Sequence, residues 1–239
     1  MFITHEAFKP KNICYKFFTK NLPGSNHRYF LHHEGHEQSN KILSEYFGSE
    51  KIAVVDQQHT NKVIITNDYN NYSVADGQVT NKSKVALAVV TADCVPILLA
   101  DDEARVVGTV HAGWRGARAN IMKEAVKQMR SLGANNITAI IGPCIKQHNY
   151  EVSEEFYKDF ILESDAYKKF FIDSLKQNHY LFDLPGYVKD KLLSLDIQQI
   201  LDVERDTYEE EDKFFSFRRT THNPDSVMGN LASVIMLLD

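Results

Sequence analysis

Few cysteines and no long apolar run set the first limits on this chain of 239 residues. Its three cysteines, Cys14, Cys94 and Cys144, cannot form a fully paired disulfide framework, which favours a reducing compartment. No apolar stretch approaches the roughly 20 residues that span a bilayer. No apolar segment follows Lys9 and Lys11, as it would in a signal peptide. We therefore expect a cytoplasmic protein with no membrane partner.

The chain also lacks an excess of positive charge and a recognisable linker. Its net charge is −5, whereas binding to the phosphate backbone of a nucleic acid requires a positive surface. No segment rich in Pro, Gly or Ser divides it, and its hydrophobic content of 43% is enough for a large core. We expect one domain over residues 1–239 that does not bind nucleic-acid polymers. The oligomeric state is left open.

Apolar periodicity predicts both strands and helices. Short β-branched runs predict strands, at 13–19, 52–56, 62–66, 85–91, 95–100, 105–111, 137–141, 197–201 and 213–219. Residues 231–238 fit either a strand or a helix. Helical spacing predicts a helix over 117–132, a shorter one over 38–47, and two or three helices within 153–195. Because strands and helices do not alternate strictly, we expect an α+β fold with mixed sheets and no doubly wound parallel sheet.

Three possible metal ligands lie at the ends of three predicted strands: His59, Cys94 and His111. Zinc favours histidine nitrogen and cysteine thiolate, and a catalytic zinc site has three protein ligands and one open position. The spacing is not that of a zinc finger. The alternative is a buried cysteine and two histidines with structural roles only.

The same side chains also fit a nucleophile and its base. Cys94 would be the nucleophile and His111 the base, with Asp93 or Gln57 as the orienting group. A zinc-bound thiolate is a weak nucleophile, so the metal site and this hydrolase exclude each other in any one state.

Nearby arginines and aromatic residues suggest an anion and a planar ring as ligands. Arg115 lies near a predicted helix start, where backbone N–H groups favour phosphate, although a surface salt bridge is the alternative. In the predicted strand at 213–219, Phe217 would stack on a base, and Arg218 or Arg219 would reach a phosphate. Core packing is the alternative for these aromatic residues.

Two further groups are interpreted as loop structure. His32, His33 and His36 are close together, but no second type of ligand accompanies them in the sequence. Cys144 and His148 form another cysteine–histidine pair, which we also assign to a loop.

Seven motifs occur in a fixed order: Gln57-Gln58-His59, Ala75-Asp76-Gly77-Gln78-Val79-Thr80, Thr91-Ala92-Asp93-Cys94-Val95-Pro96, His111-Ala112-Gly113-Trp114-Arg115-Gly116, Ile141-Gly142-Pro143-Cys144-Ile145, Tyr150-Glu151-Val152, and residues 214–219. With them, residues 50–239 resemble the bacterial YfiH-like family, also called the laccase-domain, polyphenol oxidase or peptidoglycan editing factor family. The third and fourth motifs at this separation are the most specific part of the resemblance.

The resemblance implies mixed sheets between helical layers and a zinc ion on His59, Cys94 and His111, which would also be the catalytic residues. It implies a purine nucleoside phosphorylase for adenosine, inosine and methylthioadenosine that also deaminates adenosine, with nucleosides and phosphate as partners. The expected substrate contacts are Arg115, Arg218, Phe217 and Gln57. The older name implies copper and phenol oxidation, but the chain lacks the paired His-x-His motifs of a multicopper cluster, so copper is the less favoured metal.

The chain departs from the family pattern at three places. Residues 1–50 diverge, and the family's Ser-Leu-Asn-Leu-Gly segment is not recognisable within 15–40. Asn230 stands where the family usually has arginine, and Asp206 where it has cysteine. Loss of the arginine would remove an anion contact, so a metal-bearing binding protein with little activity is a further alternative.

Overall fold

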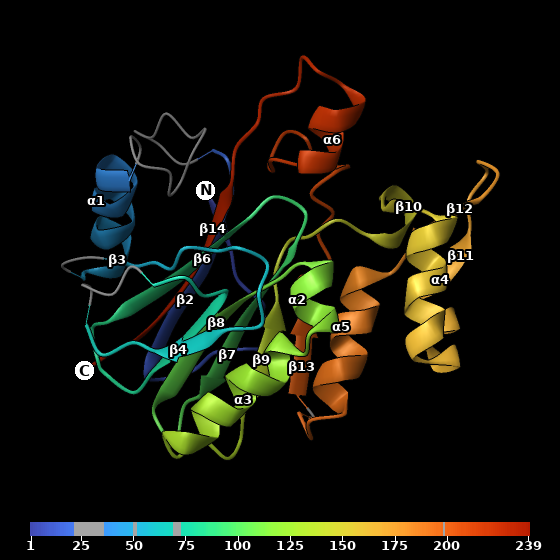
Figure 1. The fold of residues 1–239 in the computed structure, drawn as a ribbon. Coiled ribbons are helices and arrows are strands. Elements are labelled where there is room, and N and C mark those ends of the chain that lie inside the picture. The colour runs from blue at the N-terminus through green and yellow to red at the C-terminus, as the bar shows by residue number, and fades with distance from the viewer. Residues whose placement is uncertain (22–35, 50–51, 69–72, 198) are drawn as a thin grey trace.

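The β-branched segments build two mixed sheets. The computed structural model describes residues 1–21, 36–49, 52–68, 73–197 and 199–239 (Figure 1). The first sheet has the order β1 (Phe2–Ile3), β2 (Ile13–Phe18), β14 (Leu231–Leu237), β6 (Ala86–Thr91) and β3 (Ile52–Ala53). The second has the order β13 (Gln199–Asp202), β9 (Thr138–Ile141), β7 (Val95–Asp101), β8 (Val106–Ala112), β5 (Gly77–Thr80) and β4 (Val63–Ile65).

The two sheets pack face to face around an apolar core. Successive side chains of a strand point to opposite faces of its sheet. In β2, Tyr15 and Phe17 point into the space between the sheets, where they pack with Leu98 and Ile140 of the second sheet. Phe18 points the other way, toward a helix. Each face of the first sheet is therefore buried by a different layer.

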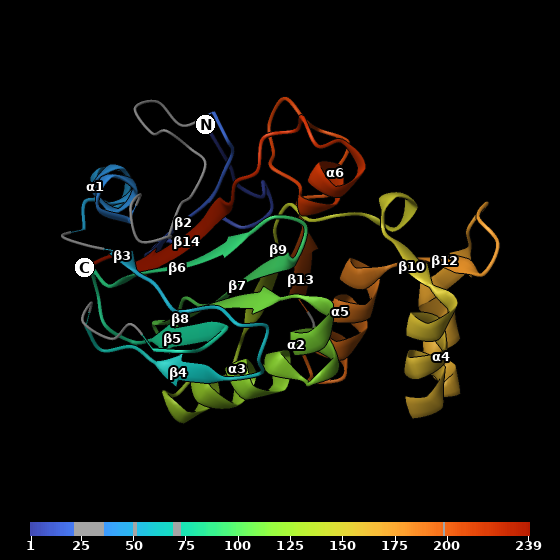
Figure 2. The same cartoon turned by 45° about the horizontal axis from the view of Figure 1, so that its top comes forward.

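Helices cover the outer faces of both sheets (Figures 1 and 2). Helix α1 (His36–Phe47) lies on the first sheet through Leu43 and Phe47. The second sheet is covered by α2 (Trp114–Arg118), α3 (Ile121–Ser131) and α5 (Leu184–Leu193). The order of layers is helix, sheet, sheet, helix, as expected for mixed sheets between helical layers.

A small antiparallel sheet lies beyond α5 with helix α4 (Glu154–Glu163) (Figure 2). Its strands are β10 (Glu151–Ser153), β12 (His179–Phe182) and β11 (Phe171–Asp173), preceded by the 3₁₀ helix η1 (Gln147–Asn149). A second 3₁₀ helix, η2 (Asp165–Phe170), follows α4, and α6 (Phe217–His222) precedes the last strand. Aromatic rings fill the junction, with Phe156 stacked on Phe160 at 4.9 Å.

Several sequence predictions need correction. The helix predicted over 117–132 is two helices, because Asn120 adopts a left-handed backbone with φ of 63° between α2 and α3. The strand predicted over 213–219 is wrong: this segment is a loop followed by α6, whose N-cap Ser216 accepts a hydrogen bond from the Arg219 N–H. The region 153–195 contains strands as well as the predicted helices.

Other predictions are confirmed or lie outside the described residues. Residues 231–237 form a strand that pairs with both β2 and β6. Of the three predicted loop histidines, His32 and His33 lie outside the described residues, and the prediction is wrong for His36, which is the first residue of helix α1. No helix in the described part of the chain combines the length and the apolarity needed to cross a membrane.

Candidate metal centre and adjoining pocket

The three predicted ligands come together where strands of both sheets end. His111 is the penultimate residue of β8, Cys94 immediately precedes β7, and His59 lies in the loop between β3 and β4. Their ligand atoms all lie within 4.8 Å of one another. The Cys94 Sγ is 3.8 Å from the His59 Nε2, and the two imidazole centroids are 4.7 Å apart.

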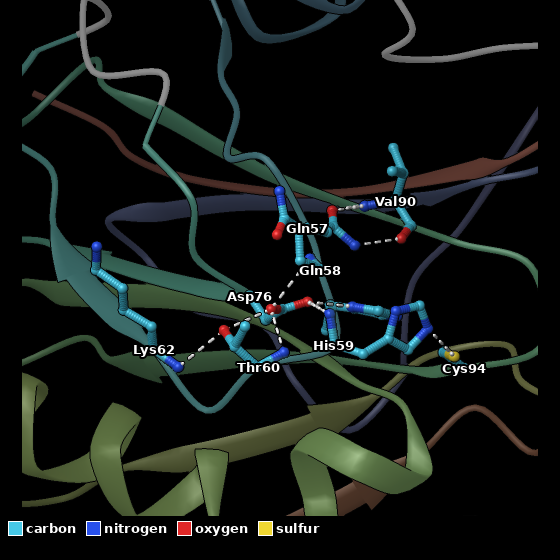
Figure 3. Close-up of polar contacts among 9 residues, drawn as sticks. Gln57, Gln58, His59, Thr60, Lys62, Asp76, Val90 and Cys94 are labelled. Carbon is cyan, nitrogen blue, oxygen red and sulfur yellow. Dashed lines mark hydrogen bonds and ion pairs between the residues drawn. The ribbon is translucent and has the colours of Figure 1, made fainter.

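Asp76 orients two of these ligands (Figure 3). Its Oδ1 is 2.8 Å from the His111 Nδ1 and accepts the backbone N–H of His59 at 2.9 Å. Its Oδ2 accepts the backbone N–H and the hydroxyl of Thr60, at 2.6 and 2.7 Å. The contact to Nδ1 leaves the His111 Nε2 free to bind a metal, as in carboxylate–histidine–zinc arrangements.

The charge of Asp76 is stabilised by these donors. Burial would raise the pKa of this carboxyl, but the hydrogen bonds from His111 and Thr60 outweigh burial and lower the pKa to about 2. The prediction that Asp93 or Gln57 orients the histidine is therefore wrong. Asp76 was present in a family motif, but nothing in its local sequence distinguished it from a surface carboxylate.

Gly113 creates the space in which the ligands meet. A Cβ at this position would lie 2.8 Å from the His59 Cδ2, closer than real Cβ atoms approach, and 3.0 Å from the Cys94 Sγ, which is tighter than most real contacts. A Cβ at Gly116 would lie 2.9 Å from the Thr60 carbonyl oxygen. These glycines thus leave room for the loop that carries the candidate ligand His59. The one thiolate and two imidazoles fit the donor preference of zinc.

The Cys94 thiol and the His111 imidazole each shift the pKa of the other. Burial would raise the pKa of Cys94, but the charge and hydrogen bonding of His111, with those of His59, lower it to about 6. Burial would lower the pKa of His111, but the charge of Cys94 and the hydrogen bond to Asp76 raise it to about 9. Both shifts describe one thiolate–imidazolium contact in the metal-free protein. The thiolate is also the form that binds metal.

A cavity of about 380 Å³ opens beside the centre. Its lining residues are His59, Ala92, Asp93, Cys94, Trp114, Arg115, Ile145, Tyr150, Leu184, Phe217, Arg218 and Thr221. Arg115, Arg218 and Phe217, which the sequence predicts as substrate contacts, therefore all line this cavity. The volume lies within the range of small-molecule sites.

Arg115 is the cation of this cavity that is available to a ligand. Its guanidinium lies 4.4 Å from the ring centroid of Trp114, and in the described part of the chain it has no hydrogen-bond or ion-pair partner. Arg218 instead donates to the carbonyl oxygen of Glu151 at 2.8 Å. Arg219 donates to backbone carbonyls of Thr207 and Tyr208, so it supports the loop and does not line the cavity.

Asp93 links the wall of the cavity to the turn that carries the candidate ligand Cys94. Its carboxylate accepts the hydroxyl of Thr207 at 2.7 Å, the hydroxyl of Ser216 at 3.0 Å and the backbone N–H of Arg218 at 2.6 Å. Burial raises the pKa of this carboxyl in spite of these donors. The bond to Arg218 fixes the start of α6, which places Phe217 and Arg218 at the cavity.

The other residues named from the sequence lie outside the cavity lining. Both ends of the Gln57 amide bind the backbone of Val90, at 2.7 and 2.8 Å, so this side chain joins the loop to β6. Cys144 is fully buried, and burial raises the pKa of its thiol to about 12. His148 is exposed, and no hydrogen bond joins it to Cys144 among the residues that the structure describes.

Comparison with known proteins identifies the family. A family model described as "Multi-copper polyphenol oxidoreductase laccase" matches residues 33–238. The chain belongs to this YfiH-like laccase-domain family. Two relatives named purine nucleoside phosphorylase are each 37% identical to it. The one from Rickettsia prowazekii aligns over 91% of this chain and 93% of its own length, and the one from Rickettsia conorii over 95% and 97%.

Solved structures of the YfiH-like family have the same fold. A crystal structure from Neisseria meningitidis gives a TM-score of 0.87 at 26% identity, covering 100% of this chain and 99% of the other. The hypothetical protein YfiH from Bacillus licheniformis gives a TM-score of 0.81 at 26% identity, covering 95% and 93%. The α+β architecture expected from the sequence is therefore confirmed.

Proposed function

We propose that this YfiH-like protein is a zinc-dependent purine nucleoside phosphorylase that acts on adenosine, inosine and methylthioadenosine and also deaminates adenosine. The observation that carries the proposal is a cluster of His59, Cys94 and His111 that opens onto a cavity with an available arginine. The names of the Rickettsia relatives support the reaction class.

The donor set supports zinc. Within the described ranges, one group of three metal-binding side chains is found, whereas a multicopper oxidase needs several copper ions. Asp76 holds the ring of His111, and Gly113 leaves room for the thiolate. Bound zinc supplies Lewis-acid polarisation and lowers the pKa of a water molecule toward about 7, which deamination requires.

Arg115 is our candidate for the phosphate ligand. Its guanidinium has no partner among the described residues and is stacked on Trp114, which limits its rotation. An arginine held in this way can bind phosphate through two parallel N–H donors. Because its charge is permanent, phosphate binding at this residue does not depend on protonation of the protein near neutral pH.

The aromatic walls supply a surface for the purine. Trp114, Tyr150 and Phe217 line the cavity, and Phe217 is 57% exposed at the start of α6. An aromatic ring can stack on a flat heterocycle in an offset arrangement. Asp93 fixes the N-terminus of α6 and thereby the position of Phe217.

A metal-free hydrolase is the second candidate, because one observation favours it. Without a metal, Cys94 and His111 form a thiolate–imidazolium pair, the state of an activated cysteine nucleophile. Such an enzyme would cleave its substrate without phosphate and would lose activity on zinc addition.

Product analysis distinguishes these functions. Purified protein is incubated with adenosine, with and without phosphate, and adenine, inosine, ribose and ribose 1-phosphate are separated. We expect phosphate-dependent adenine and ribose 1-phosphate, and inosine in both samples. Elemental analysis should give about one zinc per chain. Copper without zinc would contradict the zinc assignment, and products that are independent of both phosphate and metal would favour the hydrolase.

A further inference from the structure

Tyr150 is held firmly at the wall of the cavity. Its backbone N–H donates to the carbonyl oxygen of Gln147 at 3.2 Å, and its carbonyl accepts the N–H of Phe182 at 3.0 Å. Its ring packs on Phe182 with centroids 5.8 Å apart, and the guanidinium of Arg218 lies 5.3 Å from its ring centroid. The backbone hydrogen bonds and these two ring contacts thus restrain the position of the ring.

The hydroxyl of Tyr150 is available to a ligand. It has no hydrogen-bond partner in the described part of the chain, although the residue lines the cavity. Burial raises its pKa, and the charges of Cys94 and Asp93 act on it together with those of Arg218 and Arg115. Those residues line the same cavity as Tyr150, and the raised pKa means that the phenol carries its proton at neutral pH.

Most other groups of the cavity are already occupied. His59 and Cys94 are candidate metal ligands, and the Asp93 carboxylate accepts three hydrogen bonds. The hydroxyl of Thr221 donates to the carbonyl oxygen of Arg218 at 2.7 Å. The remaining neutral side-chain donors on the cavity lining are the O–H of Tyr150 and the indole N–H of Trp114.

We propose that Tyr150 is a catalytic residue whose hydroxyl donates a hydrogen bond to the departing purine. The inference rests on the proposed phosphorylase function. A phosphate oxygen forms a bond to C1′ of the ribose while the bond from C1′ to N9 breaks, and the electron pair of that bond remains on the purine. The Tyr150 hydroxyl stabilises this developing charge and keeps its proton. The proton released by hydrogen phosphate balances the one that the purine takes up from solvent.

The test compares two leaving groups in Tyr150→Phe, which removes the hydroxyl and keeps the ring. With inosine, kcat for phosphorolysis should fall roughly 100-fold, as when one donor directed at a developing charge is lost. The KM for phosphate and the zinc content should not change. With 7-methylguanosine, whose base leaves without accumulating negative charge, kcat should fall by less than about threefold, because the donor contributes little there.

Two control variants complete the experiment. Tyr157→Phe removes a hydroxyl from a ring that is stacked on Tyr180 at 4.1 Å and is absent from the cavity lining, and it should retain full activity on both substrates. Trp114→Phe tests the competing donor. A dependence on the leaving group in Trp114→Phe and none in Tyr150→Phe would assign the donor to Trp114 and overturn the proposal.

Equal losses on both substrates would show that Tyr150 has only a structural role, and unchanged kinetics would show that its hydroxyl is not used. Either result overturns this inference while the phosphorylase function stands. Wild-type protein that forms no ribose 1-phosphate would overturn the proposed function, and the assignment of Tyr150 with it.

Discussion

Asp76→Asn tests whether one carboxylate holds two metal ligands in place. The wild-type oxygens accept from the His59 N–H, from two donors of Thr60, and lie 2.8 Å from the His111 Nδ1. Asparagine has nearly the same shape, but it carries no charge and keeps one acceptor oxygen. The NH2 of the new amide would face one of the donor groups that bind the wild-type carboxylate, and that donor would lose its acceptor.

The magnitude follows from the pKa of Asp76. Lowering the pKa of a carboxyl from 3.8 to about 2 corresponds to roughly 2.5 kcal/mol in favour of the ionised form. A buried donor without a partner costs about 1–3 kcal/mol. We therefore expect the free energy of unfolding of the metal-free variant at pH 7 to fall by about 2–4 kcal/mol. Zinc affinity should fall roughly 10- to 100-fold, as when other groups that orient metal ligands are removed.

The assay uses urea unfolding of metal-free protein across pH and chelator competition for zinc affinity. Because the folded-state pKa of Asp76 is depressed, its contribution is present above about pH 4 and is lost as the pH falls through about 2. The difference in unfolding free energy between wild type and variant should shrink over that interval.

Asp56→Asn is the matched control. Asp56 lies in the same loop as His59 and accepts a hydrogen bond from the exposed Gln58 side chain at 2.8 Å. We expect this variant to change unfolding free energy by less than about 1 kcal/mol and zinc affinity little. If Asp76→Asn bound zinc as tightly as the wild type, Asp76 would not be orienting the ligands, and the reasoning would be refuted.

Three further variants or measurements test other parts of the site. Gly113→Ala would place a methyl group about 3 Å from the Cys94 sulfur, so zinc affinity measured by chelator competition should fall at least about tenfold; unchanged affinity would mean that the loop relaxes freely. In metal-free protein, iodoacetamide should label Cys94 with half-maximal rate near pH 6, and zinc should suppress this reaction, whereas buried Cys144 should stay unlabelled; rapid labelling with zinc bound would favour the hydrolase. Arg115→Ala should raise the KM for phosphate roughly ten- to hundredfold and reduce deamination far less. The control Arg118→Ala loses an ion pair, a hydrogen bond to a backbone carbonyl and a ring contact, all with α4 and outside the cavity lining, and it should leave that KM unchanged. Equal loss of both activities in Arg115→Ala would place the nucleoside, and not phosphate, on this residue.

Local sequence patterns predicted much of the fold because the buried face of a helix or strand recurs at a regular spacing along the chain. Ile121, Met122, Ala125, Val126 and Met129 are the buried face of α3, as their helical spacing predicts. The strand prediction for residues 213–219 was wrong because of contacts with a distant part of the chain. The aromatic residues of this segment suggested a strand, but the bonds from Ser216 and Arg218 to Asp93 fix it as a loop followed by a helix. Such a bond overrides a local preference worth at most about 1 kcal/mol.

The sequence by itself determined the chemical types of the candidate metal ligands, because residue type is a local property. It predicted strand ends for all three, and the structure places His111 near the end of β8 and Cys94 directly before β7, but His59 in the loop between β3 and β4. Only the tertiary structure decided how they meet. Asp76 reaches His111 across 35 positions of sequence, and Asp93 reaches Thr207 across 114. A hydrogen bond depends on distances of a few tenths of an ångström, which strand pairing and sheet packing set and which no local pattern encodes. The orientation of the ligands and the composition of the cavity therefore emerge when the two sheets pack together.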